Sequence, residues 1–258
     1  MSSIRVGCAG YSYDDWVGPF YPEGLPREQR LERYAQAFSF LELNFSYYAM
    51  PKLDHLEALR DRVPDTFRFS IKAHGSLTHQ RTPDWRQRAE QFLAAIKGLK
   101  PKLVGVLLQF PYSFHYTREN RRYLAEVCQA LQEADLFVEF RNREWERQSV
   151  LEGMRRRGLN RVLVDSPDLE GLPGNLAEGA SLPTDRAYLR FHGRNAERWW
   201  TGTNVTRYAY DYPGKEISEI AAKVEGLTAP EIFVIFNNHA NARAPFNALE
   251  LLKLIEVE

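Results

Sequence analysis

The sequence has no excess charge of either sign, few cysteines and no long apolar run. Lysine plus arginine and aspartate plus glutamate both number 34, so no overall field favours a polyanion or an anionic membrane as partner. The two cysteines, Cys8 and Cys128, lack metal-pair spacing, and we expect buried thiols in a reducing compartment. No stretch approaches the ~18 apolar residues of a membrane span, and residues 1–7 lack a signal-peptide pattern, so a cytoplasmic location without membrane contact is expected.

Familiar catalytic motifs are missing too. No HExxH segment or other metal-spaced motif occurs, and no serine stands in a nucleophile-elbow context. Gly7 and Gly10 form no complete dinucleotide fingerprint, and they precede a loop rich in aromatic residues instead of a helix. These absences argue against HExxH metalloproteases, serine hydrolases and Rossmann dehydrogenases, and they leave the cofactor unknown.

The chain alternates short apolar runs with helical patterns, which is typical of βα units around a parallel sheet. The eight predicted strands are residues 4–9, 40–44, 67–73, 103–110, 136–141, 161–165, 187–192 and 232–237. Helical patterns lie near 27–37, 52–62, 85–99, 117–133, 149–157, 215–226 and 245–254. With 258 residues and no linker, the sequence predicts an α/β fold, a single-domain TIM-like (β/α)8 barrel over 1–258. The Pro- and Gly-rich crossover 166–186 predicts that one barrel helix is short or missing.

Polar residues end seven of the eight predicted strands. They are Glu42 and Asn44; Lys72 and His74; Gln109; Glu139 and Arg141; Asp165; Arg190 and His192; and Asn237, Asn238 and His239. In a closed parallel barrel, alternate strand residues point inward and catalytic groups gather at the carboxyl ends of the strands. The phase of these residues therefore predicts a functional site at the barrel mouth. A purely structural ion-pair network that plugs the mouth is the alternative, because buried charges need partners.

The same residues belong to longer motifs with a resemblance to a known family. The motifs are 7–22, 41–51, 69–72 with Thr78 and His79, 109–114, 139–145, 190–194 and 236–248. Together they resemble the YecE-like family, also called domain of unknown function 72, over essentially the whole chain. Ala9, Tyr11, Ser46 and the glycine-free segment 240–243 depart from the family pattern. The resemblance implies a TIM-barrel-like fold, and it implies no mechanism because the family's activity is not established.

We expect a metal-free enzyme that uses acid/base chemistry on a small anionic or phosphorylated substrate. Lys72, Arg141 and Arg190 are predicted to hold a phosphate or carboxylate. The predicted general base is Glu42 or Glu139, and the predicted acid is His192 or His74. Further predicted substrate contacts are Asn44, His79, Gln109, Asp165, Asn237, Asn238 and His239, with Trp16, Trp199 and Tyr208 from loops 11–25 and 194–213.

Two other classes of function stay open. Glu139, Asp165 and His192 could ligate a metal in a hydrolase or isomerase, although Arg141 and Arg190 would compete with a dication. The arginine-rich stretches 118–122 and 155–157 could mark a nucleotide or nucleic-acid binding module without catalysis. Charge runs on helices are usually solvated faces, and zero net charge also weighs against nucleic acid.

Overall fold

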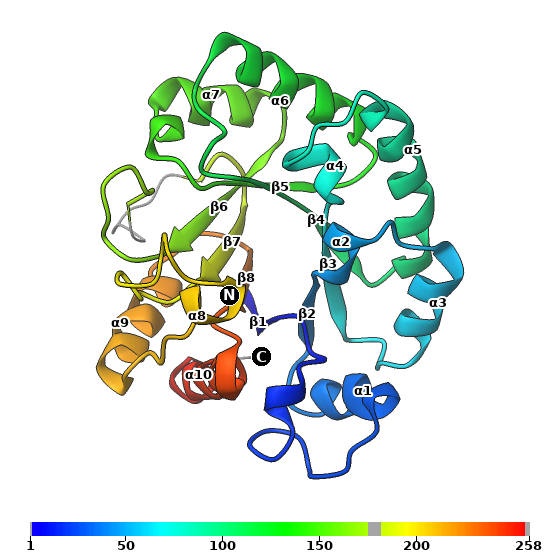
Figure 1. Ribbon diagram of the computed structural model, residues 1–258, viewed down its shortest axis with the longest axis vertical. Helices are drawn as coiled ribbons and strands as arrows, with labels where there is room; N and C mark the ends of the chain where they lie inside the picture. The colour runs from blue at the N-terminus through cyan, green and yellow to red at the C-terminus, as the bar shows by residue number, and fades with distance from the viewer. Residues whose placement is uncertain (1, 175–181, 256–258) are drawn as a thin grey trace.

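Eight parallel strands close into a barrel in the order in which they occur along the chain (Figure 1). The computed structural model describes residues 2–174 and 182–255. The strands are β1 (Ser3–Ala9), β2 (Phe40–Leu43), β3 (Arg68–Lys72), β4 (Leu103–Phe110), β5 (Leu136–Phe140), β6 (Asn160–Asp165), β7 (Arg186–Phe191) and β8 (Glu231–Phe236). Each predicted strand is present, with ends that differ by no more than one residue, and the TIM-like fold is confirmed.

Helices form an outer layer around the barrel (Figure 1). They are α1 (Arg30–Ala35), α3 (Leu53–Asp61), α5 (Trp85–Ile96), α6 (Arg118–Ala130), α7 (Gln148–Arg156), α9 (Gly214–Glu225) and α10 (Arg243–Leu254). Shorter helices lie in the loops: η1 (Asp14–Trp16), η2 (Arg27–Gln29), α2 (Phe45–Tyr48), α4 (Gly75–Thr78), η3 (Lys97–Leu99), η4 (Arg143–Trp145), α8 (Asn204–Arg207) and η5 (Ala240–Ala242). The described part of crossover 166–186 contains no helix, and residues 175–181 of that prediction lie outside the described residues.

Alternate strand residues separate the inside of the barrel from its outside. Phe40, Phe137, Tyr188 and Phe233 pack against one another inside the barrel, together with aliphatic residues such as Leu107. The residues between them face the helices and join the larger outer core. Because side chains alternate along a strand, the residue two positions beyond an inner aromatic also points inward. This places Glu42, Glu139 and Arg190 directly above the aromatic layer.

The described part of the chain contains no helix with both the length and the apolar character needed to cross a bilayer. The cytoplasmic location stays a prediction.

A close approach of β1 to β2 depends on Gly7. The Tyr34 hydroxyl accepts a hydrogen bond from the Cys8 amide at 2.7 Å and donates to the Phe40 carbonyl at 2.9 Å. A methyl group on Gly7 would lie 2.0 Å from the Phe40 carbonyl oxygen, which is too close for two atoms that are not bonded. Glycine at this position is therefore required by contact, not by backbone conformation.

We predict that Gly7→Ala destabilises the fold by about 2–3 kcal/mol, because inserted volume must displace a strand backbone. Gly153→Ala in α7 is the matched control, since its new methyl group has no neighbour closer than 3.5 Å. That change should stabilise the protein by roughly 0.5–1 kcal/mol through helix propensity. Urea unfolding measures both, and equal midpoints for the wild type and Gly7→Ala would contradict the prediction.

Candidate functional site

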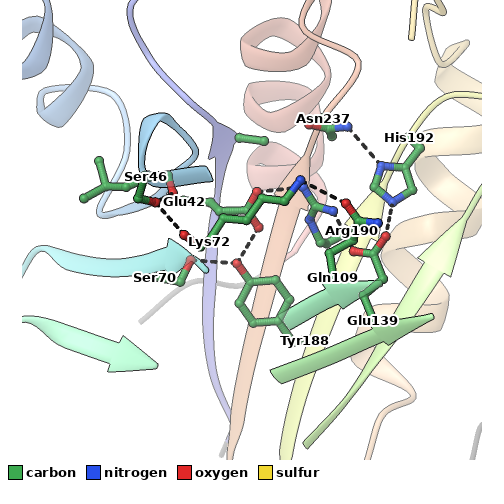
Figure 2. A network of polar contacts seen from close by, with 12 residues as sticks. Glu42, Ser46, Ser70, Lys72, Gln109, Glu139, Tyr188, Arg190, His192 and Asn237 are labelled. Carbon is green, nitrogen blue, oxygen red and sulfur yellow. Dashed lines mark hydrogen bonds and ion pairs between the residues drawn. The ribbon is translucent and has the colours of Figure 1, made fainter. Parts of the chain in front are cut away.

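Arg190 on β7 bridges two buried carboxylates across the barrel interior (Figure 2). Its Nη2 donates to Oε1 of Glu42 on β2 at 2.7 Å, and its Nη1 donates to Oε2 of Glu139 on β5 at 2.6 Å. Both carboxylates are fully buried, and Arg190 is 2% exposed. Buried charges remain stable only when they are paired and hydrogen-bonded, and this arrangement meets that requirement for both acids.

Glu42 is held from below by an inner tyrosine. The Tyr188 hydroxyl donates to Glu42 Oε2 at 2.8 Å and also hydrogen-bonds the Ser70 hydroxyl at 2.7 Å (Figure 2). Each carboxylate oxygen of Glu42 therefore has a donor within the barrel. Tyr188 belongs to the aromatic layer, so it links the apolar interior to the charged layer above.

Glu139 is held by two further groups. Its Oε1 accepts from Nε of Arg141 and lies 3.2 Å from His192 Nε2, while the other nitrogen of His192 lies 3.1 Å from the Asn237 amide. Burial opposes ionisation of Glu139, but the charges of Arg141 and Arg190 outweigh it and hold its pKa well below the usual range. Burial, with the charge of Arg141, lowers the pKa of His192 to about 3. His192 is thus neutral, and we assign its proton to Nε2, where it can be donated to Glu139.

The charged layer forms the base of an open pocket of about 720 Å³. Ten residues predicted from the sequence line it: Asn44, Lys72, His79, Gln109, Arg141, Arg190, Trp199, Tyr208, Asn237 and His239. Ten others line it that the sequence reasoning missed: Tyr13, Tyr47, Tyr48, Pro111, Tyr112, Ser113, Leu172, Trp200, Asn204 and Arg207. Six of these ten stand within the quoted family motifs, which was the available signal for them: Tyr13, Tyr47, Tyr48, Pro111, Tyr112 and Ser113.

The charges that line the pocket are all positive among its described residues. Lys72, Arg141, Arg190 and Arg207 line it, and no aspartate or glutamate does. Glu42 and Glu139 lie behind this surface with no exposed area. The Nε atoms of Arg190 and Arg207 are buried without a hydrogen-bond partner in the described structure. The charged side chains that line the pocket are therefore cations, and the acids that pair with two of them lie beneath the surface.

Lys72 ends β3 and lies in this pocket with a neutral hydrogen-bond acceptor. Its Nζ donates to Gln109 Oε1 at 2.9 Å (Figure 2). The same atom lies 4.3 Å from the centre of the Tyr47 ring. The Gln109 amide nitrogen donates to the Phe110 carbonyl at 2.8 Å, which fixes the amide with its oxygen toward Lys72. Burial, with the charge of Arg190, lowers the pKa of Lys72 to about 7.

His79 and Tyr208 supply the other titratable groups that face the pocket near Lys72. His79 Nδ1 lies 2.9 Å from the Thr78 hydroxyl, and burial, with the charge of Lys72, lowers the pKa of His79 to about 4. Burial works to raise the pKa of Tyr208, but the neighbouring Arg141 guanidinium lowers it overall. His79 is therefore neutral at pH 7, and the Tyr208 hydroxyl is more acidic than an ordinary phenol.

Aromatic rings form the walls of the pocket. Tyr13 stacks on His239 with ring centres 4.6 Å apart, and Trp199 meets Tyr208 edge to face at 5.9 Å. At the rim, Tyr112 meets Trp200 at 4.7 Å, and Trp200 is half exposed. The pocket thus combines flat aromatic walls with a base of cationic side chains.

Seven residues predicted for the site do not line the pocket. Glu42, Glu139 and His192 lie behind it. Trp16 is buried and donates to the His239 carbonyl at 2.7 Å. His74 caps α4 by accepting from the Ser76 amide at 3.2 Å. The other two are Asp165 and Asn238, which hold the long loop after β7.

Loop 194–213 is attached to the barrel by Asp165 and its neighbours. The Asp165 carboxylate accepts from Arg194 at 2.7 Å and from the Tyr212 hydroxyl at 2.8 Å, which in turn accepts from the Gly193 amide at 2.8 Å. The Asn238 side chain donates to the Tyr210 carbonyl at 2.9 Å. These contacts position the part of the loop that brings Trp199, Arg207 and Tyr208 over the pocket.

The geometry also bears on the two other classes of function. Asp165 pairs with Arg194, and Glu139 is held by Arg141 and Arg190, so these acids have protein cations as partners. Over residues 2–174 and 182–255, no group of three or more His, Cys, Asp or Glu is arranged to hold a metal. The arginines of stretches 118–122 and 155–157 are exposed, on α6 and at or just beyond the end of α7. Arg122 and Arg156 pair with glutamates of their own helices.

The closed barrel and the pocket at the carboxyl ends of its strands define a TIM-barrel protein with a cavity large enough for a small molecule. The chain belongs to the family described as protein of unknown function DUF72, whose model it matches over residues 5–258. The resemblance identified in the sequence motifs is therefore confirmed.

Relatives from several bacteria share this family membership. UPF0759 protein YunF of Bacillus subtilis is 30% identical over 280 residues, which cover 99% of this chain and 95% of YunF. UPF0759 protein YecE of Escherichia coli K12 is 30% identical over 173 residues, 63% of this chain and 59% of YecE. Among solved structures, the DUF72 protein TM1631 of Thermotoga maritima matches with a TM-score of 0.89 at 35% identity, covering 98% of both chains. The DUF72 protein EF0366 of Enterococcus faecalis matches with a TM-score of 0.86 at 26% identity, covering 99% of this chain and 96% of that one.

We predict that Arg190→Met lowers the free energy of unfolding by about 3–5 kcal/mol at pH 7, because it leaves two buried carboxylates without their shared cation. Adding Glu139→Gln should restore part of the loss by removing one of those charges. Because the pKa of Glu139 is lowered in the folded state, this group stabilises the fold at pH values above its unfolded pKa of about 4.3. That contribution is lost as the pH falls through the folded pKa. The difference in free energy of unfolding between the wild type and Arg190→Met should therefore become smaller below about pH 4.

Urea unfolding at pH 7 and at about pH 3 measures these differences. Arg155→Ala, an exposed arginine at the end of α7, is the control and should change stability by less than ~0.5 kcal/mol. If Arg190→Met lowered the free energy of unfolding by no more than the control does, the buried network would not be a stabilising unit.

Proposed function

We propose that the pocket binds a small organic anion, such as a phosphorylated or carboxylate-bearing metabolite, and that the protein acts on it by acid/base chemistry. The observation that carries this proposal is the one-sided charge of the lining. Four cationic side chains line the pocket, and the two acids nearest to them are fully buried behind Arg190. A ligand with negative charge would complete the balance that the protein itself leaves open.

Arg141 is the principal anion contact in this proposal. Its side chain is 12% exposed, and Glu139 holds its Nε, so its position is fixed before a ligand arrives. An arginine oriented in this way offers its remaining N–H groups as a fork to a phosphate or carboxylate. Pre-orientation lowers the entropy cost of binding, which gives buried Glu139 a positioning role.

Proton transfer in this proposal belongs to groups that line the pocket. Lys72, His79 and Tyr208 line it, whereas Glu42, Glu139 and His192 have no exposed area. A pKa of about 7 gives Lys72 both a neutral and a protonated form near neutral pH, which suits a general base or acid. The roles first predicted for Glu42 and Glu139 thus pass to Lys72, with the two acids serving the cations beside it.

We expect Arg141→Ala to weaken the binding of inorganic pyrophosphate by at least about tenfold, the effect of losing roughly one charge-assisted contact. Arg141→Lys should retain part of the affinity, because charge without the fork remains. Isothermal titration calorimetry at low salt measures binding, and circular dichroism checks the fold. Arg155→Ala is the control and should bind as the wild type does; an unchanged affinity in Arg141→Ala would refute the assignment.

We also expect sulfate affinity to fall by about tenfold between pH 6 and pH 8, which corresponds to ~1.4 kcal/mol. Sulfate keeps its charge over this range, whereas Lys72 loses a proton as the pH rises through about 7. The charged groups around Lys72 are Arg190, Arg141, Glu139 and Glu42, and neighbouring His79 is already neutral with a pKa of about 4.

Lys72→Arg is the matched variant for this measurement, because it keeps the charge at every pH tested. Its sulfate affinity, followed by calorimetry, should be nearly independent of pH. If sulfate affinity changed with pH equally in the wild type and in Lys72→Arg, a group other than Lys72 would control the pH dependence of anion binding.

A further inference from the structure

Lys72 differs from an ordinary paired lysine in the contacts of its amine. The amine donates to the amide oxygen of Gln109, and no aspartate or glutamate of the described chain forms an ion pair with it. Lys102 provides a contrast, because its amine lies 3.3 Å from Asp65 and donates to the Val63 carbonyl at 2.7 Å. Lys102 is thus held as a buried cation, whereas Lys72 has no counter-ion that would fix its proton.

The acids that could have paired with Lys72 are occupied. Glu42 receives hydrogen bonds from Arg190 and Tyr188, and Glu139 receives them from Arg190 and Arg141. Figure 2 shows the Lys72 chain lying alongside this network with its amine directed to Gln109. The amine is also the single lysine amine among the described residues that line the pocket. A primary amine without a counter-ion, set among guanidinium groups, has its lone pair available as a nucleophile.

We infer that Lys72 forms a covalent imine with the carbonyl carbon of a small anionic aldehyde or ketone bound in the pocket. This inference rests on the proposed function, since the anionic group would be held by the cationic lining. It adds a covalent step and a substrate class: a carbonyl compound with a phosphate or carboxylate group. The lowered pKa of Lys72 supports the same reading, because a larger share of the amine is neutral at pH 7.

The chemical step balances with groups present in the pocket. The neutral amine adds to the carbonyl carbon, and the electron pair of the C=O bond moves to oxygen, which takes up a proton. The nitrogen of this carbinolamine then loses a proton, the hydroxyl gains one, and water leaves as the C=N bond forms. The product of this step is the protonated imine, which becomes the neutral imine when its nitrogen releases the remaining proton. The sum is one carbonyl compound plus one amine giving one imine plus water, without oxidation or reduction.

His79 and Tyr208 line the same pocket and are suited to move these protons. Thr78 occupies Nδ1 of His79, so the Nε2 of this neutral ring is the nitrogen that remains to exchange a proton with the carbinolamine. Protonation of the imine would add positive charge beside Arg190 and Arg141. The acidic group of the substrate offsets that charge, which is the physical reason for expecting an anionic carbonyl compound.

The experiment uses pyridoxal 5′-phosphate, an aldehyde that carries a phosphate, followed by borohydride to convert any imine into a stable secondary amine. Peptide mass spectrometry then locates the label. The expected result is labelling of Lys72, absent in Lys72→Arg and unchanged in Lys253→Arg, an exposed lysine of α10. Pyridoxal without the phosphate should label Lys72 at least about tenfold less, as should the full probe in Arg141→Ala. Sulfate that occupies the pocket should reduce the labelling of Lys72.

Three results would overturn the inference in whole or in part, and they separate it from the proposed function. Label spread over exposed lysines, with Lys72 unlabelled while sulfate still binds in an Arg141-dependent manner, would refute the imine and leave anion binding standing. Absence of both Lys72 labelling and sulfate binding would refute the two together. Equal labelling of Lys72 by pyridoxal and by its phosphate would refute the anionic substrate class.

Discussion

The ion pairs of Arg190 with Glu42 and Glu139 are the interaction on which the mouth of this barrel depends. Three strands on different sides of the barrel meet through one guanidinium, with both acids fully buried. Such a network is stable only if each charge keeps its partners, so Tyr188 from the aromatic layer and His192 from the rim complete the hydrogen bonds. The same network that closes the barrel interior also fixes the base of the pocket.

The charged groups of the barrel mouth differ in role according to how deeply they are buried. The buried layer is close to charge balance, because two carboxylates face Arg190 and Arg141. Above it, Lys72 and Arg207 line the pocket without an acidic partner in the described structure. Groups below this boundary orient the lining side chains and shift their pKa values, whereas only the groups above it can contact a ligand. This is why the amine of Lys72, and not the carboxylates, is the centre of the proposed chemistry.

The long loop after β7 makes the site more than a barrel opening. Asp165 is at the end of β6, yet its carboxylate anchors Arg194 and Tyr212 of that loop. The anchored loop carries Trp199, Arg207 and Tyr208 to the pocket, where Tyr208 adjoins the guanidinium of Arg141. Asp165, predicted from the strand-end pattern as a substrate contact, therefore holds the loop that supplies part of the pocket.

The sequence by itself determined the barrel, because eight strand-like runs, most of them followed by a helical pattern, are local features that a closed parallel sheet requires. It also located the mouth, since strand-end residues such as Lys72, Arg141 and Arg190 meet wherever parallel strands close. Only the tertiary structure decided depth and partners: Glu42 and Glu139 share the phase of Lys72 but lie behind Arg190. Spacing along a strand gives the face of a side chain, whereas burial and pairing depend on neighbours from distant strands. Loop 194–213 was expected at the mouth, but only the tertiary contacts that anchor it decide that Trp200 and Arg207 also line the pocket.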